Sequence, residues 1–246
     1  MDLLLLSNSR NHGQELLAHA RDEIDDFLGT VRRIVFVPYA LADHDAYTAS
    51  IASALEPIGV RVEGVHRFPD PGQAIREAEA VFVGGGNSFR LLKTLQSTGL
   101  VEAIGPRVRA GELRYLGSSA GTNMACPTLR TTNDMPIVQP TSFAAFGFVP
   151  FQINPHYLDP DPTSTHMGET REQRLIEFLE ENDVPVLGIR EGGWLRVHDG
   201  HARLGGANGA RLFLRGERPR ELAPDADVSF LLHAEPRYDV GPEQRS

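Results

Sequence analysis

Short apolar runs alternate with segments of helical periodicity along the first half of this 246-residue chain. The runs predict β-strands, which we expect at residues 3–7, 34–37, 60–65, 80–83 and 115–117. The segments between them place apolar residues on one helix face, and we expect helices at residues 14–28, 46–55, 74–80 and 88–95. This order is typical of an α/β fold in which a mostly parallel sheet is covered by helices on both faces, which gives three layers.

The second half of the chain has a different pattern. Residues 127–155 are rich in Thr, Pro and Asn, which predicts an excursion of loops and short strands suited to lining a site. Asp199-Gly200 lies between two apolar runs and predicts a β-hairpin. The other elements expected are a helix at 172–181 and strands at 186–189, 194–197, 202–204 and 212–214. We interpret residues 1–246 as one α/β domain with a loose tail from about residue 235.

Composition narrows the classes of function. The formal net charge is −9 and the longest basic run is the pair Arg32-Arg33, which disfavours a nucleic-acid or anionic-membrane partner. Cys126 is the one cysteine, so no internal disulfide can form. No apolar stretch approaches the ~20 residues of a membrane span, and residues 1–6 lack the basic region and cleavage site of a signal peptide. The sequence carries no signal for an oligomeric state, and we expect a cytoplasmic protein.

The strongest chemical signal is the motif Gly117-Ser118-Ser119-Ala120-Gly121, which follows an apolar stretch. Gly-x-Ser-x-Gly is the spacing of a nucleophile elbow, in which a strand turns sharply into a helix. Residues without side chains allow the turn, and the central serine lies exposed at its tip, beside the helix N-terminus. The motif alone is weak evidence of catalysis, since its residues are common ones. It makes Ser119 the candidate nucleophile of a hydrolase.

A serine nucleophile requires a base and an orienting acid. His156 is the candidate base among the nine histidines, because an apolar strand ends there at a rigid proline. Asp134, in the segment between Ser119 and His156, is the first candidate acid, and Glu191, just after the strand at 186–189, is the competing one. Each also has an ordinary interpretation as a loop or turn residue.

An oxyanion needs backbone donors, and a glycine-rich loop can supply them. The N–H of Ala120 is one candidate. The loop Gly84-Gly85-Gly86-Asn87 offers another at Gly85 or Gly86, because glycine lets a backbone approach a substrate closely. Asn87 is a candidate substrate-binding residue. The loop matches neither a Rossmann fingerprint nor a P-loop, and a tight turn or a phosphate cradle is its alternative interpretation.

Arg171 begins the helix that follows the loop-rich segment. A guanidinium binds a carboxylate through two hydrogen bonds, so Arg171 is a candidate for a substrate carboxylate, against the alternative of a solvated helix charge. No Cys/His or His/Glu spacing suggests a metal site, and we expect neither a metal nor a cofactor. Cys126 is expected to be a small buried residue.

Together these motifs resemble the peptidase E family, the aspartyl dipeptidases, which are serine peptidases with the class I glutamine amidotransferase-like fold. The matching pieces follow the family's order and lie at residues 3–9, 83–87, 119–121, 125–128, 130–138, 152–156 and 168–174, with 188–192 the clearest piece beyond them. The resemblance implies Ser119 as nucleophile, His156 as general base and Asp134 as orienting acid. It also implies that Arg171 recognises aspartate and that the partner is a small peptide, a dipeptide with an N-terminal aspartate. Some relatives use a glutamate as the third residue, which keeps Glu191 as the alternative.

Other functions fit the same residues. A peptidase of the same superfamily that cleaves β-aspartyl links, such as those of cyanophycin, would share the fold and Ser119 but require a longer cleft. A non-catalytic binding module would have kept the fold and lost the chemistry, which the intact serine, histidine and acid candidates disfavour. An amidotransferase is disfavoured as well, because the elbow carries serine and not the cysteine that attacks glutamine.

Overall fold

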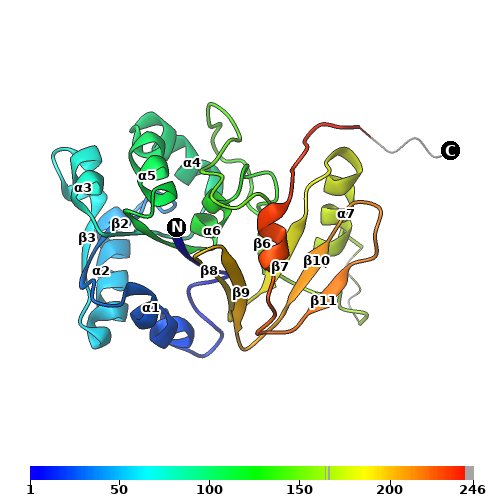
Figure 1. Cartoon of the computed structure of the whole chain (residues 1–246), viewed down its shortest axis with the longest axis horizontal. Coiled ribbons are helices and arrows are strands. Elements are labelled where there is room, and N and C mark those ends of the chain that lie inside the picture. Colours follow the sequence, from blue (N-terminus) through cyan, green and yellow to red (C-terminus); the bar gives the residue numbers. More distant parts are fainter. Residues whose placement is uncertain (164, 166, 242–246) are drawn as a thin grey trace.

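The computed structural model describes residues 1–163, 165 and 167–241, and in this part of the chain the strands form two sheets (Figure 1). The helices and strands are, in chain order, β1 (Asp2–Leu6), α1 (Arg21–Leu28), β2 (Arg33–Val37), α2 (His44–Leu55), β3 (Arg61–Gly64), α3 (Pro71–Glu77), β4 (Ala80–Val83), α4 (Ser88–Ser97), α5 (Leu100–Arg109), β5 (Arg114–Ser118), α6 (Ala120–Ala125), β6 (Gln152–Tyr157), α7 (Arg171–Glu181), β7 (Val186–Arg190), β8 (Gly193–His198), β9 (His201–Gly206), β10 (Ala210–Phe213) and β11 (Arg220–Leu222).

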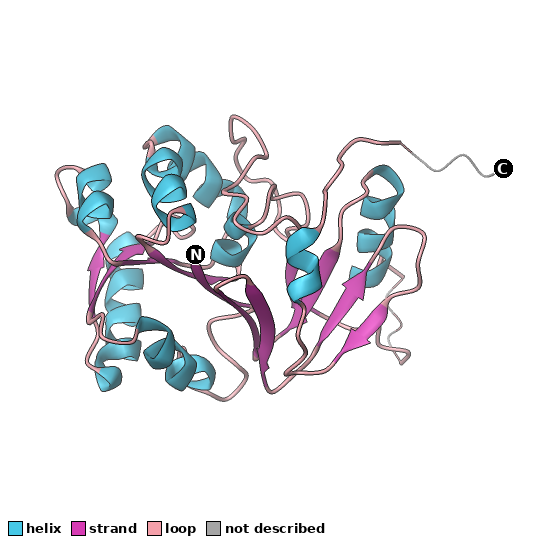
Figure 2. Cartoon of the chain, in the orientation of Figure 1, coloured by secondary structure: helices cyan, strands magenta, loops and turns pink. Residues whose placement is uncertain are grey.

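The larger sheet has the strand order β3-β2-β4-β5-β1-β8-β9 (Figure 2). Its first five strands are parallel, and the predicted hairpin, β8 with β9, adds two antiparallel strands beside β1. Helices α1 and α2 cover one face, and α3, α4, α5 and α6 cover the other (Figure 1). The predicted three-layer α/β fold with a mostly parallel sheet is confirmed.

Side chains of β1 alternate between the two faces of the sheet and so contact both helix layers. Leu3 and Leu5 pack with the apolar residues of α4 and α5, whereas Leu4 and Leu6 pack with those of α1 and α2. All four leucines are fully buried, because a central parallel strand is covered on both faces. Burial of a leucine side chain stabilises a fold by about 1.5–3 kcal/mol, so this run places β1 in the middle of the sheet.

The smaller sheet has the order β11-β10-β7-β6 and packs against α7 (Figure 1). Its strands β6 and β7 are parallel, whereas β10 pairs antiparallel with β7 and β11. Leu187 and Ile189 of β7 belong to the same hydrophobic core as Leu3 and Leu5 of β1, so the two sheets share one core. The sequence predicts β6, β7 and β10 but not their separation from the larger sheet, because periodicity does not identify a strand's pairing partner.

Two helices differ from the expectation. The helix expected at 14–28 begins only at Arg21, because Leu17 has φ +60° and a short 3₁₀ turn follows it. Helix α5 is not predicted by the sequence pattern, since it contains Gly105 and Pro106, which disfavour a helix interior. Among the helices of the described residues, none has the length and apolar character needed to cross a bilayer.

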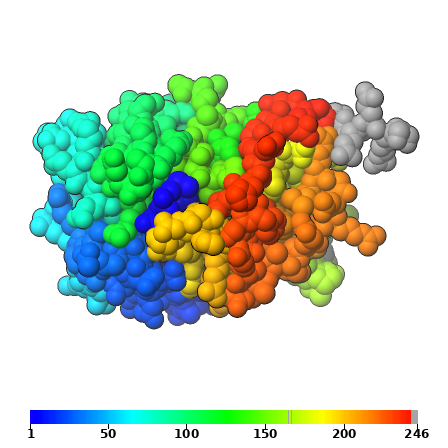
Figure 3. All heavy atoms as spheres, in the orientation of Figure 1, coloured from blue at the N-terminus to red at the C-terminus, as the bar shows by residue number. Residues whose placement is uncertain are grey.

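The end of the described chain is held against the rest of the molecule. Asp183 and Arg237 exchange two backbone hydrogen bonds, and Asp239 accepts two hydrogen bonds from the guanidinium of Arg130. Figure 3 shows the last described residues, coloured red, lying along the surface. Residues 237–240 therefore differ from the loose tail expected, while 242–246 lie outside the described residues.

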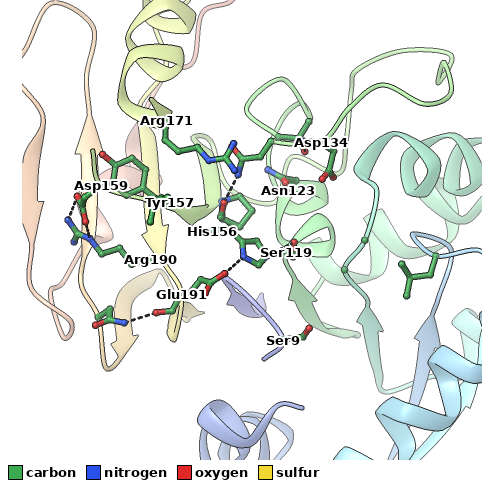
Figure 4. Close-up of a pocket in the computed structure, with 18 of the residues that line it drawn as sticks. Ser9, Ser119, Asn123, Asp134, His156, Tyr157, Asp159, Arg171, Arg190 and Glu191 are labelled. Carbon is green, nitrogen blue, oxygen red and sulfur yellow. Dashed lines mark hydrogen bonds and ion pairs between the residues drawn. The ribbon is translucent and has the colours of Figure 1, made fainter. Parts of the chain in front are cut away.

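The carboxyl ends of several strands meet at one place. Strands β4, β5 and β1 end next to one another, with Val83 paired to Gly117 and Leu6 to Ser118. Strands β6 and β7 of the smaller sheet end beside each other and face the end of β5 (Figure 4). Ligand sites of parallel sheets form beyond such ends, and the candidate residues of the sequence lie there.

Candidate active site

Ser119 lies at the turn between β5 and α6 (Figure 4). Its backbone has φ +53° and ψ −109°, a conformation that residues with side chains rarely adopt. Two glycines make the turn possible. A Cβ on Gly117 would lie 2.7 Å from the carbonyl oxygen of Gly121, and a Cβ on Gly121 would overlap the carbonyl oxygen of Val83. The turn has the geometry expected of a nucleophile elbow.

His156 lies at the end of β6, opposite the elbow. Its Nε2 is 3.0 Å from Ser119 Oγ, within hydrogen-bond distance. Its backbone has φ +53° and is held by Ser7, whose Oγ accepts the His156 N–H over 2.8 Å. The Ser7 hydroxyl in turn donates to the carbonyl of Ile189 over 2.8 Å. One buried hydroxyl, at the end of β1, therefore connects the ends of β6 and β7.

The acid next to His156 is Glu191. Its Oε1 is 2.6 Å from His156 Nδ1, on the side of the ring away from the serine (Figure 4). This corrects the expectation that Asp134 lies against the histidine. The physical reason is strand pairing. Asn154 of β6 pairs with Gly188 of β7, so His156 near the end of β6 and Glu191 just after β7 come together, although they are 35 positions apart in the chain.

Asp134 lies near the same site but has other partners. Its Oδ2 accepts the N–H of Ser88 over 2.7 Å and the hydroxyl of Ser88 over 2.6 Å, at the first residue of α4. Helix starts favour carboxylates, because their first N–H groups lack helical partners. The Asn87 side chain accepts the N–H of Arg90 and donates to the carbonyl of Met135. Asn87 is not among the described residues that line the cavity, and its role in substrate binding stays a prediction.

Two asparagines fix the backbone around Glu191. Asn208 donates from Nδ2 to the carbonyl of Glu191 over 2.7 Å, and Asn8 Oδ1 accepts the N–H of Gly192 over 2.8 Å. The sequence reasoning missed both asparagines and Ser7. A signal was present for two of them, because Ser7 and Asn8 are polar residues directly after a buried strand, where sites of parallel sheets form.

The glycine loop after β4 approaches the serine closely. A Cβ on Gly85 would lie 3.1 Å from the Cβ of Ser119, so a side chain there would crowd that residue. The Gly85 N–H donates to the hydroxyl of Tyr47 over 2.8 Å, and burial raises the pKa of that phenol to about 12. The Gly86 N–H has no hydrogen-bond partner in the described part of the chain. Of the expected oxyanion donors, the N–H groups of Gly86 and Ala120 are therefore the available ones.

Two further polar residues of the elbow region are buried away from the cavity. The hydroxyl of Ser118 has no hydrogen-bond partner among the described residues. Cys126 Sγ accepts the N–H of Ile153 over 3.1 Å, and burial raises the pKa of its thiol to about 12. Cys126 thus packs between α6 and β6, as expected of a small buried residue.

Ser119, His156 and Glu191 open onto a cavity of about 850 Å³, within the usual range for small-molecule sites. Two arginines line it. Arg190 donates to both carboxylate oxygens of Asp159, over 2.7 and 2.8 Å, and this contact raises the pKa of Arg190. Arg171, the first residue of α7, makes no ion pair within the described residues, and burial lowers its pKa.

Across the described residues, no group of three or more His, Cys, Asp or Glu side chains could hold a metal ion.

Residues 3–205 match the family model described as peptidase family S51. The chain belongs to peptidase family S51. It is 63% identical to a Streptomyces coelicolor protein named peptidase E, over 98% of this chain and 99% of the relative. It is 52% identical to a Drosophila melanogaster protein named "Probable alpha-aspartyl dipeptidase", over 94% of this chain and 97% of that one. A solved structure of a peptidase from an acI-B1 Actinobacterium has the same fold, with a TM-score of 0.64 at 17% identity, covering 93% of this chain and 96% of that one.

The family resemblance noted from the sequence is therefore confirmed, and this S51 member is a serine-type peptidase. Its cavity holds a serine hydroxyl, an imidazole and a carboxylate in hydrogen-bonded sequence. This chain of hydrogen-bonded side chains can move a proton from the hydroxyl to the imidazole, while the carboxylate stabilises the imidazolium. The arrangement can therefore activate a serine for attack on a carbonyl.

Proposed function

We propose that this S51 peptidase hydrolyses dipeptides with an N-terminal aspartate through an acyl-enzyme on Ser119. The observation that carries the proposal is the pair of contacts around His156. Ser119 Oγ lies 3.0 Å from Nε2, and Glu191 Oε1 lies 2.6 Å from Nδ1. The name of the Drosophila relative, which refers to an alpha-aspartyl dipeptidase, supports the choice of substrate.

Acylation begins when Ser119 Oγ attacks the peptide carbonyl and its proton passes to His156 Nε2. Glu191 accepts the Nδ1–H of the ring, which keeps the Nε2 lone pair directed at the serine and stabilises the imidazolium. The N–H groups of Gly86 and Ala120 bind the oxyanion of the tetrahedral intermediate. His156 then protonates the departing amine, and the second residue of the dipeptide leaves.

Deacylation repeats these steps with water in place of the serine. His156 takes a proton from the attacking water, the same N–H groups bind the second oxyanion, and the proton returns to Ser119 as aspartate is released. Each step uses groups that line or adjoin one cavity.

Arg171 supplies the preference for aspartate. Its partly buried guanidinium lines the cavity without an ion pair to any described residue. A substrate carboxylate would therefore gain a charge-assisted hydrogen bond and neutralise a poorly solvated cation. Arg190 is unsuited to this role, because its guanidinium is bound to Asp159 and Glu221.

The test is a substrate panel assayed with purified protein: Asp-Leu, Glu-Leu, Ala-Leu and β-Asp-Leu. We expect hydrolysis of Asp-Leu above the others, and its loss in Ser119→Ala. Ser118→Ala is the matched control, since it removes the neighbouring hydroxyl, which has no partner among the described residues. Preferred hydrolysis of β-Asp-Leu would replace the proposal by the β-aspartyl alternative, and no hydrolysis of any dipeptide would favour the binding module.

A further inference from the structure

An aspartyl dipeptide carries two opposite charges on its first residue, the side-chain carboxylate and the free α-ammonium. A buried ammonium requires a hydrogen-bond acceptor as much as a buried carboxylate requires a donor. The following inference rests on the proposed function, in which Arg171 binds the carboxylate. The same cavity must then offer an acid to the ammonium.

Three acidic side chains line the cavity in the described part of the chain: Asp159, Glu191 and Asp134. Both oxygens of Asp159 accept hydrogen bonds from Arg190, so this carboxylate is already neutralised. Glu191 is engaged with His156, and an ammonium on it would compete with the imidazolium that forms during the reaction. These two acids therefore have other tasks.

Asp134 combines a fixed position with an unused oxygen. Its Oδ2 accepts two hydrogen bonds from Ser88, a fully buried residue, which holds the carboxylate in place. Its Oδ1 receives no hydrogen bond from the described residues. Figure 4 shows Arg171 reaching from α7 toward the loop that carries Asp134. The charge of Asp134 is close enough to oppose the effect of burial on the pKa of Arg171.

We propose that Asp134 Oδ1 binds the α-ammonium of the substrate while Arg171 binds its side-chain carboxylate. The two charged groups of an aspartyl residue are only a few bonds apart, and the cavity places an acid and a base near each other to receive them. A peptide extended at its N-terminus has a neutral amide in place of the ammonium. Asp134 thereby selects for a free N-terminus and restricts the enzyme to the first residue of a chain.

The experiment compares Asp-Leu with N-succinyl-leucine, which is the same molecule with hydrogen in place of the α-amino group. The wild-type enzyme is expected to have a kcat/KM about 10- to 100-fold higher for Asp-Leu, the range of a hydrogen bond to a charged group. In Asp134→Asn this preference is expected to fall to about threefold or less, through loss of activity on Asp-Leu alone. Inhibition constants for aspartate and succinate, the two products, should follow the same pattern.

Asp159→Asn is the matched control, because it neutralises another acid of the same cavity. We expect it to keep the preference for the amino compound. An equal loss on both substrates in Asp134→Asn would mean that Asp134 only supports the loop on Ser88, and this would overturn the inference while leaving the proposed function intact. Loss of the preference in Asp159→Asn would also overturn it. A wild-type enzyme that hydrolyses neither compound would overturn the proposed function as well.

Discussion

The two sheets contribute to the site in different ways. The larger sheet supplies the serine elbow and the glycine loop, whose geometry follows from a few consecutive residues such as Gly117 and Gly121 around Ser119. The smaller sheet supplies His156 and Glu191, which are 35 positions apart and meet because β6 and β7 pair. The position of Ser119, the proposed nucleophile, is encoded locally, whereas its proposed activation depends on contacts between distant segments. Substitutions in the larger and the smaller sheet should therefore impair the protein in different ways.

The largest effect is expected on the smaller sheet, from Glu191→Gln. The amide cannot stabilise the imidazolium and favours the wrong tautomer of His156, so kcat on Asp-Leu should fall about 10³- to 10⁴-fold. The fold should be unchanged, as circular dichroism can verify. Retention of more than a tenth of the wild-type kcat would show that the carboxylate is not needed, and would weaken the contrast between the two sheets.

On the larger sheet the corresponding change is Gly121→Ala, which should damage the fold itself. The added methyl group would overlap the carbonyl oxygen of Val83, a backbone atom that cannot rotate away. We expect the free energy of unfolding to fall by about 3 kcal/mol or more, measured by urea denaturation. Gly72→Ala, in α3, is the control, because its nearest neighbours are flexible side chains. A similar loss in both variants would show that the elbow is not the sensitive point.

A smaller effect is expected where the two sheets meet, from Ser7→Ala. The change leaves the His156 N–H and the Ile189 carbonyl without their buried partner. We expect about 1–3 kcal/mol of lost stability and a decrease in kcat of about tenfold, with KM unchanged, as His156 becomes less well positioned. Ser118→Ala, which removes an unpartnered buried hydroxyl, should change neither quantity. A normal kcat in Ser7→Ala would mean that the strand pairing alone positions the histidine.

The smallest effect is expected at Cys126, between α6 and β6. Its thiol is fully buried and, because burial raises its pKa to about 12, it stays protonated at all pH values near neutrality. Iodoacetamide at pH 8 should leave native enzyme active and unmodified, and should modify the cysteine only after denaturation, as mass spectrometry can follow. Rapid modification of the native enzyme would show that α6 and β6 separate easily and expose the thiol.

The same contrast determines how much the sequence could predict. The parallel sheet, the elbow at Ser119 and the glycine loop follow from local patterns, and they are found where expected. The acid beside His156 is different, since the sequence ranks Asp134 before Glu191, and only the pairing of β6 with β7 brings Glu191 to the histidine. Local propensity also fails for α5, whose Gly105 and Pro106 are tolerated because Ile104 and Val108 are buried in the core. At the acid beside His156 and in α5 alike, contacts between distant segments decide the structure, and local patterns do not reveal such contacts.

Ser119 and His156 share one backbone property, a φ of +53°. This restricts which amino acids evolution or protein engineering can place there. A β-branched residue is strongly disfavoured at positive φ, so threonine cannot replace Ser119, the proposed nucleophile, without rebuilding the turn, although it also carries a hydroxyl. Cysteine, which is not branched at Cβ, can occupy the turn. The backbone at position 119 thus accepts a change from serine to cysteine and disfavours a change to threonine.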